Sequence, residues 1–276
     1  MEAKGALRYA NQVRLAILLL LVGLTAAACR REPAAAVPTE VRVAAAADLS
    51  TAFLEVGRAF EAKHHLRVTF SFGSTGLLAK QLSSGAPFDV FAAASRGFVD
   101  EVLKNSDACD GASAQAYGRG RVALFVPKDS PAGAVPSVLE ELREPRFAHV
   151  AIANPEHAPY GLAAKQALEH HDVWKSVEPR LVFAENVRQA MQLAESGNVE
   201  AAFVALSLVV NAPADTWLLV PESAHPAIEQ VLVVCRHGPN AAGGEAFARF
   251  VNSDEGRAVM KRFGFMLPGE NVGRLP

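Results

Sequence analysis

Four short segments place hydrogen-bonding residues just before an expected helix. Each follows an apolar run, so each would join the end of a strand to the start of a helix. The first N–H groups of a helix have no partner within the helix and lie at the positive end of its dipole. Helix starts of this kind are ready sites for anions. The segments are 46–49 (AADL), 72–76 (FGSTG), 154–161 (NPEHAPYG) and 184–188 (AENVR).

Hydroxyl groups add side-chain donors to these segments. Ser74 and Thr75 stand between Gly73 and Gly76, which let the backbone approach a ligand closely, and Tyr160 adds a phenol. Such donors could hold a dianion without Lys or Arg, which would suit binding followed by release because charge-assisted pairs are stronger. The competing interpretation is helix N-capping, which Ser, Thr, Asp and Asn commonly perform. Four such segments in one chain favour a binding site.

The elements that position these segments alternate between strand and helix from residue 41 onward. This alternation predicts an α/β fold with mainly parallel sheets covered on both faces. Expected strands are 41–46, 67–72, 88–93, 121–126, 149–153, 181–184, 201–204, 217–220 and 228–234. Expected helices are 49–64, 77–82, 97–104, 160–170, 186–196, a short one ending at 210, 244–252 and 254–263.

These elements fall into two sets, which predicts two lobes with a ligand-binding cleft between them. The first lobe would comprise residues 41–120, and the second would comprise 121–228 with the crossing strands. Residues 229–276 would return to the first lobe. Ligands of open α/β sheets bind at the carboxyl ends of the strands, where the four segments are expected.

The N-terminus has the pattern of an export signal. Arg8 and Arg14 precede an apolar run over 15–24, and small residues then lead to Cys29. We expect a signal peptide at 1–28, lipidation of Cys29 and a tether at 29–40, with ordinary cleavage near Ala28 as the alternative. The protein would then reside in the periplasm or cell envelope, and a lipid on Cys29 would anchor it to the membrane.

The composition argues against several classes of function. The 276-residue chain has a formal net charge of −2 and no basic stripe, so nucleic acid is not an expected partner. It contains no phosphate-binding GxxxxGK[ST] motif and no GxSxG nucleophile motif. No catalytic residue is therefore expected. Cys109 and Cys235 form no motif, and we expect two free, buried thiols, although export would permit a disulfide.

Six segments, in order, resemble the periplasmic molybdate-binding proteins of ABC importers. They are 43–49 (VAAAADL), 73–76 (GSTG), 85–91 (GAPFDVF), 154–161 (NPEHAPYG), 184–190 (AENVRQA) and 203–207 (FVALS). The resemblance implies a two-lobed type II binding fold that closes over molybdate or tungstate. The ligand's metal would be held through its oxygens, with no direct protein–metal ligand. It further implies a monomer that needs no other cofactor and delivers its ligand to a permease with its ATPase.

The resemblance also implies a set of oxyanion-binding residues, matched motif by motif. They are Ala47, Asp48, Ser74, Thr75, Tyr160 and Val187, the last through its backbone N–H. Two positions depart from the family pattern. Asp48 stands where some members have Ser or Asn, and we expect its side chain to turn inward and cap the helix 49–64. Ala205 stands where some relatives carry a ligand Tyr, a role that Tyr160 could fill.

Two other functions stay open at the level of sequence. Sulfate and phosphate share the tetrahedral shape of molybdate, and cavity dimensions cannot be read from a sequence. An exported hydrolase or a structural lipoprotein is the alternative from a different class, since Ser, His and Asp are all present.

Overall fold

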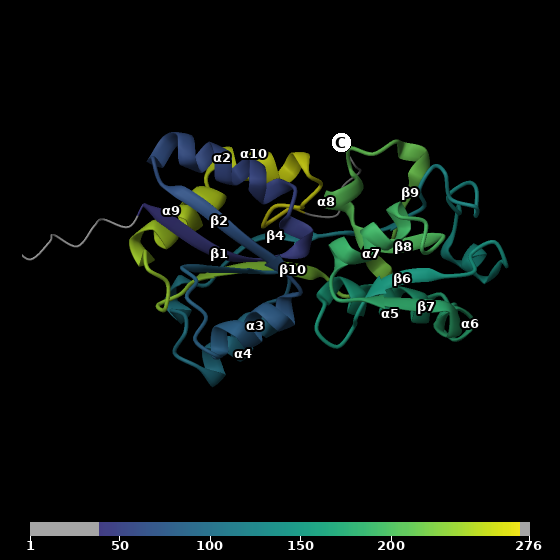
Figure 1. Ribbon diagram of the computed structural model, residues 1–276, viewed down its shortest axis with the longest axis horizontal. Coiled ribbons are helices and arrows are strands. Elements are labelled where there is room, and N and C mark those ends of the chain that lie inside the picture. Colours follow the sequence, from purple (N-terminus) through teal and green to yellow (C-terminus); the bar gives the residue numbers. More distant parts are fainter. Residues whose placement is uncertain (1–38, 271–276) are drawn as a thin grey trace, which may run out of the picture. The chain divides into compact units, whose positions relative to one another are not determined.

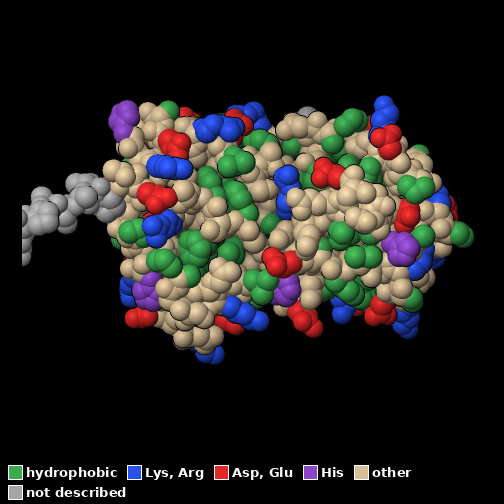
Figure 2. All heavy atoms as spheres, in the orientation of Figure 1, with side chains coloured by type: hydrophobic (Ala, Val, Ile, Leu, Met, Phe, Trp, Pro, Cys, Tyr) green, Lys and Arg blue, Asp and Glu red, His purple; other side chains and the backbone are tan. Residues whose placement is uncertain are grey.

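The computed structural model describes residues 39–270, which belong to one compact unit. The expected signal peptide, Cys29 and nearly all of the expected tether lie outside the described residues. Within residues 39–270, no helix is long and apolar enough to cross a membrane. Over the face drawn in Figure 2, Lys and Arg side chains are interspersed with Asp and Glu. An anion that binds must therefore be held by local groups, because this face has no broad positive field.

The first sheet has five strands in the order β2-β1-β3-β10-β4. Strands β1 (Glu40–Ala46), β2 (Arg67–Gly73) and β3 (Val90–Ala93) are parallel. Strand β10 (Ile228–Val234) runs antiparallel to both β3 and β4 (Gln115–Gly120). The C-terminal part of the chain thus returns to the first sheet through β10.

The second sheet has five strands in the order β7-β6-β8-β5-β9. Strands β6 (Val150–Ala153), β7 (Leu181–Ala184) and β8 (Ala201–Ala205) are parallel. Strands β5 (Val122–Phe125) and β9 (Trp217–Leu219) complete it with antiparallel pairing. In both sheets, the first of the three parallel strands lies between the other two. The expected two-lobed α/β class is confirmed, and both sheets are mixed.

Helices cover both faces of the first sheet (Figure 1). On one side lie α2 (Ala52–His64), α9 (Ala241–Val251) and α10 (Asp254–Arg262), which pack against one another. On the other side lie α3 (Thr75–Ser83) and α4 (Arg96–Asn105). The alternation of β1 explains this arrangement, since Val41, Val43 and Ala45 enter one buried cluster and Ala44 enters the other.

Helices α5 (Pro159–His170) and α7 (Val187–Glu195) pack on the strands of the second sheet. The remaining elements are short. They are α6 (Trp174–Val177), α8 (Leu206–Val209) and the 3-10 turns η1 (Ala47–Leu49), η2 (Gly111–Ser113), η3 (Leu139–Arg143), η4 (Glu178–Arg180), η5 (Ala214–Thr216) and η6 (Glu222–Ala224).

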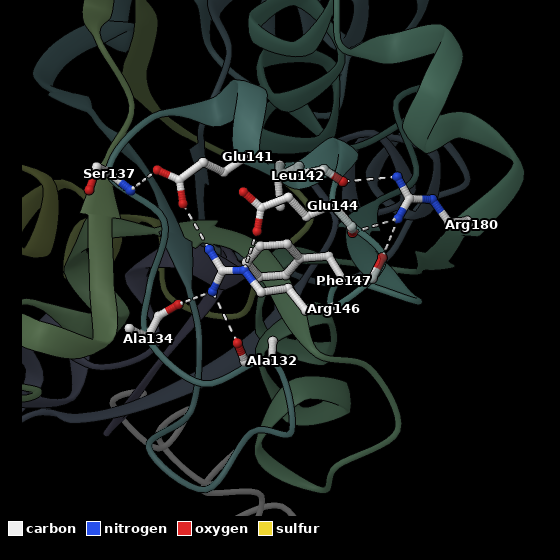
Figure 3. A network of polar contacts seen from close by, with 9 residues as sticks. All are labelled: Ala132, Ala134, Ser137, Glu141, Leu142, Glu144, Arg146, Phe147 and Arg180. Atoms are coloured by element: carbon white, nitrogen blue, oxygen red, sulfur yellow. Dashed lines mark hydrogen bonds and ion pairs between the residues drawn. The ribbon is translucent and has the colours of Figure 1, made fainter.

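Two arginines hold the long connection between β5 and β6 in place, Arg146 from within the connection and Arg180 from η4 (Figure 3). Arg146 forms ion pairs with two carboxylates, and its guanidinium lies 4.4 Å from the centre of the Phe147 ring. Arg180 donates to three backbone carbonyl groups of this connection, in and just after η3. The partners of Arg146 are Glu141, Glu144 and the carbonyls of Ala132 and Ala134, and those of Arg180 include the carbonyls of Leu142, Glu144 and Phe147. These donors replace the sheet hydrogen bonds that the connection lacks.

The expectation of free thiols is wrong, because Cys109 and Cys235 form a disulfide. Cys235 directly follows β10, and Cys109 lies opposite it as an isolated antiparallel bridge. Both side chains are buried in the apolar cluster between the first sheet and helices α3 and α4. Two residues 126 positions apart meet because β10 returns to the first sheet.

Candidate functional site

The carboxyl ends of four parallel strands lead into the four segments singled out above. In the first sheet Ala46 pairs with Gly73, so the segments after β1 and β2 start side by side. In the second sheet Ala153 pairs with Ala184, which does the same for the segments after β6 and β7. The starts of η1, α3, α5 and α7 then surround one small cavity between the two lobes.

All six residues expected to bind the oxyanion line this cavity. Its lining consists of Ala46, Ala47, Asp48, Gly73, Ser74, Thr75, Ala94, Ala158, Pro159, Tyr160, Asn186 and Val187. The structure therefore brings together residues that are up to 140 positions apart, from Ala47 to Val187. Their contact with a ligand stays a prediction.

The cavity is small and contains no cationic side chain. Its volume is about 10 Å³, whereas a groove of about 360 Å³ opens beside it and shares Ala94, Ala158 and Pro159 with it. None of the described residues that line the small cavity is Lys, Arg or His. A lining of this kind suits a compact polar ligand. The small volume excludes sugars, peptides and nucleotides unless the lobes open widely.

Three of the four helix starts keep their N–H groups free of side-chain caps. Ser74 and Ala158 precede α3 and α5 without a capping bond, and η1 also begins without one. At α7, Asn186 does cap the helix. Its side chain accepts from the N–H groups of Arg188 and Gln189 but not from the N–H group of Val187. Side-chain N-capping therefore does not account for the whole set, and it leaves the first N–H groups of these elements, such as that of Val187, open to the cavity.

The Asp48 side chain is buried, as expected, but it does not cap a helix. Helix α2 begins at Ala52, and its N-cap residue Thr51 makes no side-chain capping bond. The Asp48 carboxyl instead accepts hydrogen bonds at Oδ2 from the Tyr160 hydroxyl, at 3.0 Å, and from Gln230 Nε2, at 2.8 Å. The predicted cap was wrong because burial made these two donors available, and neither is near Asp48 in sequence.

The two lobes are joined at the cavity by further hydrogen bonds. The Ser74 hydroxyl donates to the His157 carbonyl at 2.6 Å, and the Gly76 N–H donates to the same oxygen at 2.9 Å. From α8, the Ser207 hydroxyl donates to the Asp48 carbonyl at 2.7 Å. These contacts orient the segments of opposite lobes toward one another.

A Ser–His pair exists at this site but lacks the third member of a triad. The Ser74 hydroxyl lies 2.8 Å from His157 Nδ1. Among the described residues, no Asp or Glu contacts the His157 imidazole, so nothing orients the ring as a general base. The described residues also contain no cluster of three His, Cys, Asp or Glu with the geometry of a metal site. The Ser74–His157 pair thus contributes a contact between the two lobes.

Sequence reasoning missed two residues of this site, His157 and Gln230. His157 lies in the segment 154–161 but was not among the expected binding residues, yet it contacts Ser74 through both its carbonyl and its ring. Gln230 is fully buried within strand β10, in which every other buried residue is apolar. A lone amide at a buried position of a strand is a signal for a specific hydrogen-bond partner, and could have pointed to it.

Comparison with known proteins places the chain in a family. Residues 41–266 match the family model described as bacterial extracellular solute-binding protein. This match covers both sheets and the whole cavity, so the chain belongs to that family.

Individual relatives align over most of their length. The molybdate-binding protein ModA of Azotobacter vinelandii is 32% identical over 91% of this chain and 97% of its own. A solved structure, the periplasmic molybdate-binding protein of the same organism, superposes with a TM-score of 0.76 at 27% identity, over 83% of this chain and 99% of its own. YvgL of Bacillus subtilis, 28% identical over 81% of this chain and 85% of its own, carries the words ABC transporter substrate-binding lipoprotein in its name.

Proposed function

We propose that this protein captures molybdate, or tungstate, and delivers it to an ABC importer. The observation that carries the proposal is the convergence of four helix starts and two hydroxyl-bearing residues, Thr75 and Tyr160, on one compact cavity without a cation. The names of the Azotobacter vinelandii relatives point to the same ligand. Each oxygen of a tetrahedral dianion could accept from N–H groups of both lobes or from the Thr75 hydroxyl, so binding would favour the closed arrangement.

The same proposal covers the protein's location and partners. Cys29 follows a signal-like segment, and we place the protein in the periplasm or at the envelope, with a lipid on Cys29 as its anchor. A permease and its ATPase would receive the ligand. The protein acts as a monomer, without a catalytic step and without a cofactor apart from the ligand.

Molybdate is expected to raise the unfolding temperature of the purified protein. A ligand that binds only the folded state stabilises it by about 2.7 kcal/mol at a hundred times its dissociation constant. Thermal unfolding should be followed with molybdate, tungstate, sulfate and phosphate in parallel. A shift with sulfate or phosphate alone would replace the proposed ligand by that oxyanion. No shift with any of the four, together with hydrolysis of a test ester, would favour the hydrolase alternative.

A Thr75→Val variant is expected to bind molybdate about 10- to 100-fold more weakly, because a hydrogen bond to a charged group contributes about 1.5–3 kcal/mol. The Thr75 oxygen accepts from the Ala94 N–H at 3.3 Å, so its own hydrogen is available to the cavity. Isothermal titration calorimetry would measure the change. Thr216→Val is the matched control, since buried Thr216 bonds the Pro213 carbonyl away from the cavity. Equal affinity of the Thr75 variant and the parent protein would remove Thr75 from the binding set.

A further inference from the structure

The Asp48 carboxyl has one satisfied oxygen and one without a protein partner. Oδ2 accepts from Tyr160 and Gln230. The Gln230 amide is itself oriented, because its Oε1 accepts a 2.8 Å hydrogen bond from the Tyr117 hydroxyl. In this arrangement Nε2 of Gln230 faces Asp48, and Oδ2 is the oxygen that accepts from it. Oδ1 is buried and has no hydrogen-bond partner in the protein.

An unpartnered carboxyl oxygen at this place needs an explanation. Asp48 is 1% exposed and lines the cavity, so Oδ1 cannot be satisfied by bulk water. If it were ionised, Oδ1 would place a negative charge beside the proposed dianion, with no cation in the lining to offset it. If it were protonated, Oδ1–H would be a donor, as are the other groups around the cavity.

The groups that face Asp48 do not supply a compensating charge. From α5 and β4 it faces Tyr160 and Tyr117, whose pKa values burial raises well above their usual range, with the Asp48 charge adding to the effect. From β10 and α8 it faces the neutral side chains of Gln230 and Ser207. From the segment before α5, His157 lies near the cavity but contacts Ser74. Burial raises the pKa of Asp48 itself to about 7, opposed by the bonds from Tyr160 and Gln230.

We propose that Asp48 holds the oxyanion as a neutral carboxylic acid, donating from Oδ1–H to one oxygen of the dianion. The inference rests on the proposed function, and adds to it that binding is coupled to one proton. When Asp48 is ionised in the free protein, that proton comes from solvent and returns there on release. No covalent bond of the ligand changes.

The proposal separates two chemical classes of tetrahedral oxyanion. Molybdate, tungstate and sulfate carry no proton near neutral pH, so each needs the donor that protonated Asp48 supplies. Hydrogen phosphate carries a proton of its own and could donate it to ionised Asp48. The Asp48 carboxyl thus makes the preferred class of oxyanion depend on pH. Unprotonated dianions are favoured at a pH below the pKa of Asp48.

The expected pH dependence follows from the state of Asp48 in the free protein. Below pH of about 7 the carboxyl is already neutral, and molybdate affinity should not change with pH. Above that value each unit of pH should weaken binding by about tenfold, because ionised Asp48 must first take up a proton. The unprotonated dianions therefore bind fully on the acidic side and progressively less on the alkaline side.

Calorimetric titration of the purified protein with sodium molybdate between pH 6 and 9 tests this. Repeating each titration in two buffers of different ionisation enthalpy counts the protons taken up, with an expected value near one above pH 8. Asp48→Asn keeps the shape and provides an amide donor. It should bind within a few-fold of the parent protein at pH 6, and about 100-fold more tightly than the parent at pH 9, with no slope.

Two variants control for other titrating groups near the cavity. Glu156→Gln removes an exposed carboxylate beside the groove, and His157→Gln removes the nearest imidazole. Both should keep the slope of the parent protein, and His157→Gln is judged by its slope alone, because His157 contacts Ser74 in the site. Binding without proton uptake above pH 8, or a slope that survives in Asp48→Asn, would overturn the proposal. If Asp48→Asn does not fold, the number of protons that the unaltered protein takes up on binding still tests the proposal. No molybdate binding at any pH would instead overturn the proposed function on which this inference rests.

Discussion

Replacing Cys109 and Cys235 with alanine is expected to lower the free energy of unfolding by about 2–5 kcal/mol. The bond closes a loop of 126 positions, which contains every strand of the second sheet. Long loops lose the most conformational entropy in the unfolded chain when they are closed, so the effect should be near the upper end of this range. Chemical denaturation of the parent protein and the double variant would measure it.

Reduction of the parent protein supplies the matched comparison. A reductant breaks the bond but keeps both sulfur atoms in the apolar cluster beside α3 and α4, so it separates the cross-link from the loss of packing. Molybdate affinity should be the same in the parent and the double variant, because neither cysteine lines the cavity. Equal stability before and after reduction would contradict the expected contribution of the cross-link.

The location of the candidate site could be predicted from the sequence because its segments obey a local rule. Each follows a short apolar strand and precedes a helical pattern, and parallel strands bring such segments to one edge. The lobes also follow from alternation of strands and helices along the chain. Ser74 and Thr75 lie between two glycines, and this local pattern alone was enough to single out the segment after β2.

What could not be predicted depends on contacts between residues distant in sequence. Asp48 and Gln230 are 182 positions apart, so the bond that replaces the expected helix cap has no local signature. The disulfide likewise depends on where β10 inserts. Strand β4 was not expected at all, because its sequence QAYGRG has two glycines and no apolar alternation, and its pairing with β10 stabilises it.

Replacing Gly161 with alanine is expected to weaken molybdate binding at least tenfold, and to cost about 1–3 kcal/mol of stability or more. A Cβ atom there would lie 2.6 Å from the backbone carbon of Ala153, and closer still to its oxygen. Backbone cannot move aside as a flexible side chain can, so the start of α5 would shift away from the end of β6. The Tyr160 and Gly161 N–H groups would move with it. Calorimetry and thermal unfolding of the variant would measure both effects.

Gly97→Ala is the matched control. It makes the same substitution in the first turn of another helix, α4, but without a collision between the new Cβ atom and the backbone. A Cβ atom at Gly97 meets no atom closer than the Ser95 hydroxyl at 3.6 Å, an ordinary contact, so stability should be kept or slightly increased. Gly161 lies in the segment 154–161, where its missing side chain lets the helix start approach the strand end. If Gly161→Ala binds molybdate as tightly as Gly97→Ala, the N–H groups of α5 do not contact the ligand. Affinity lost in the Gly161 variant alone would tie recognition of the anion to the close packing of a helix start on the strand that precedes it.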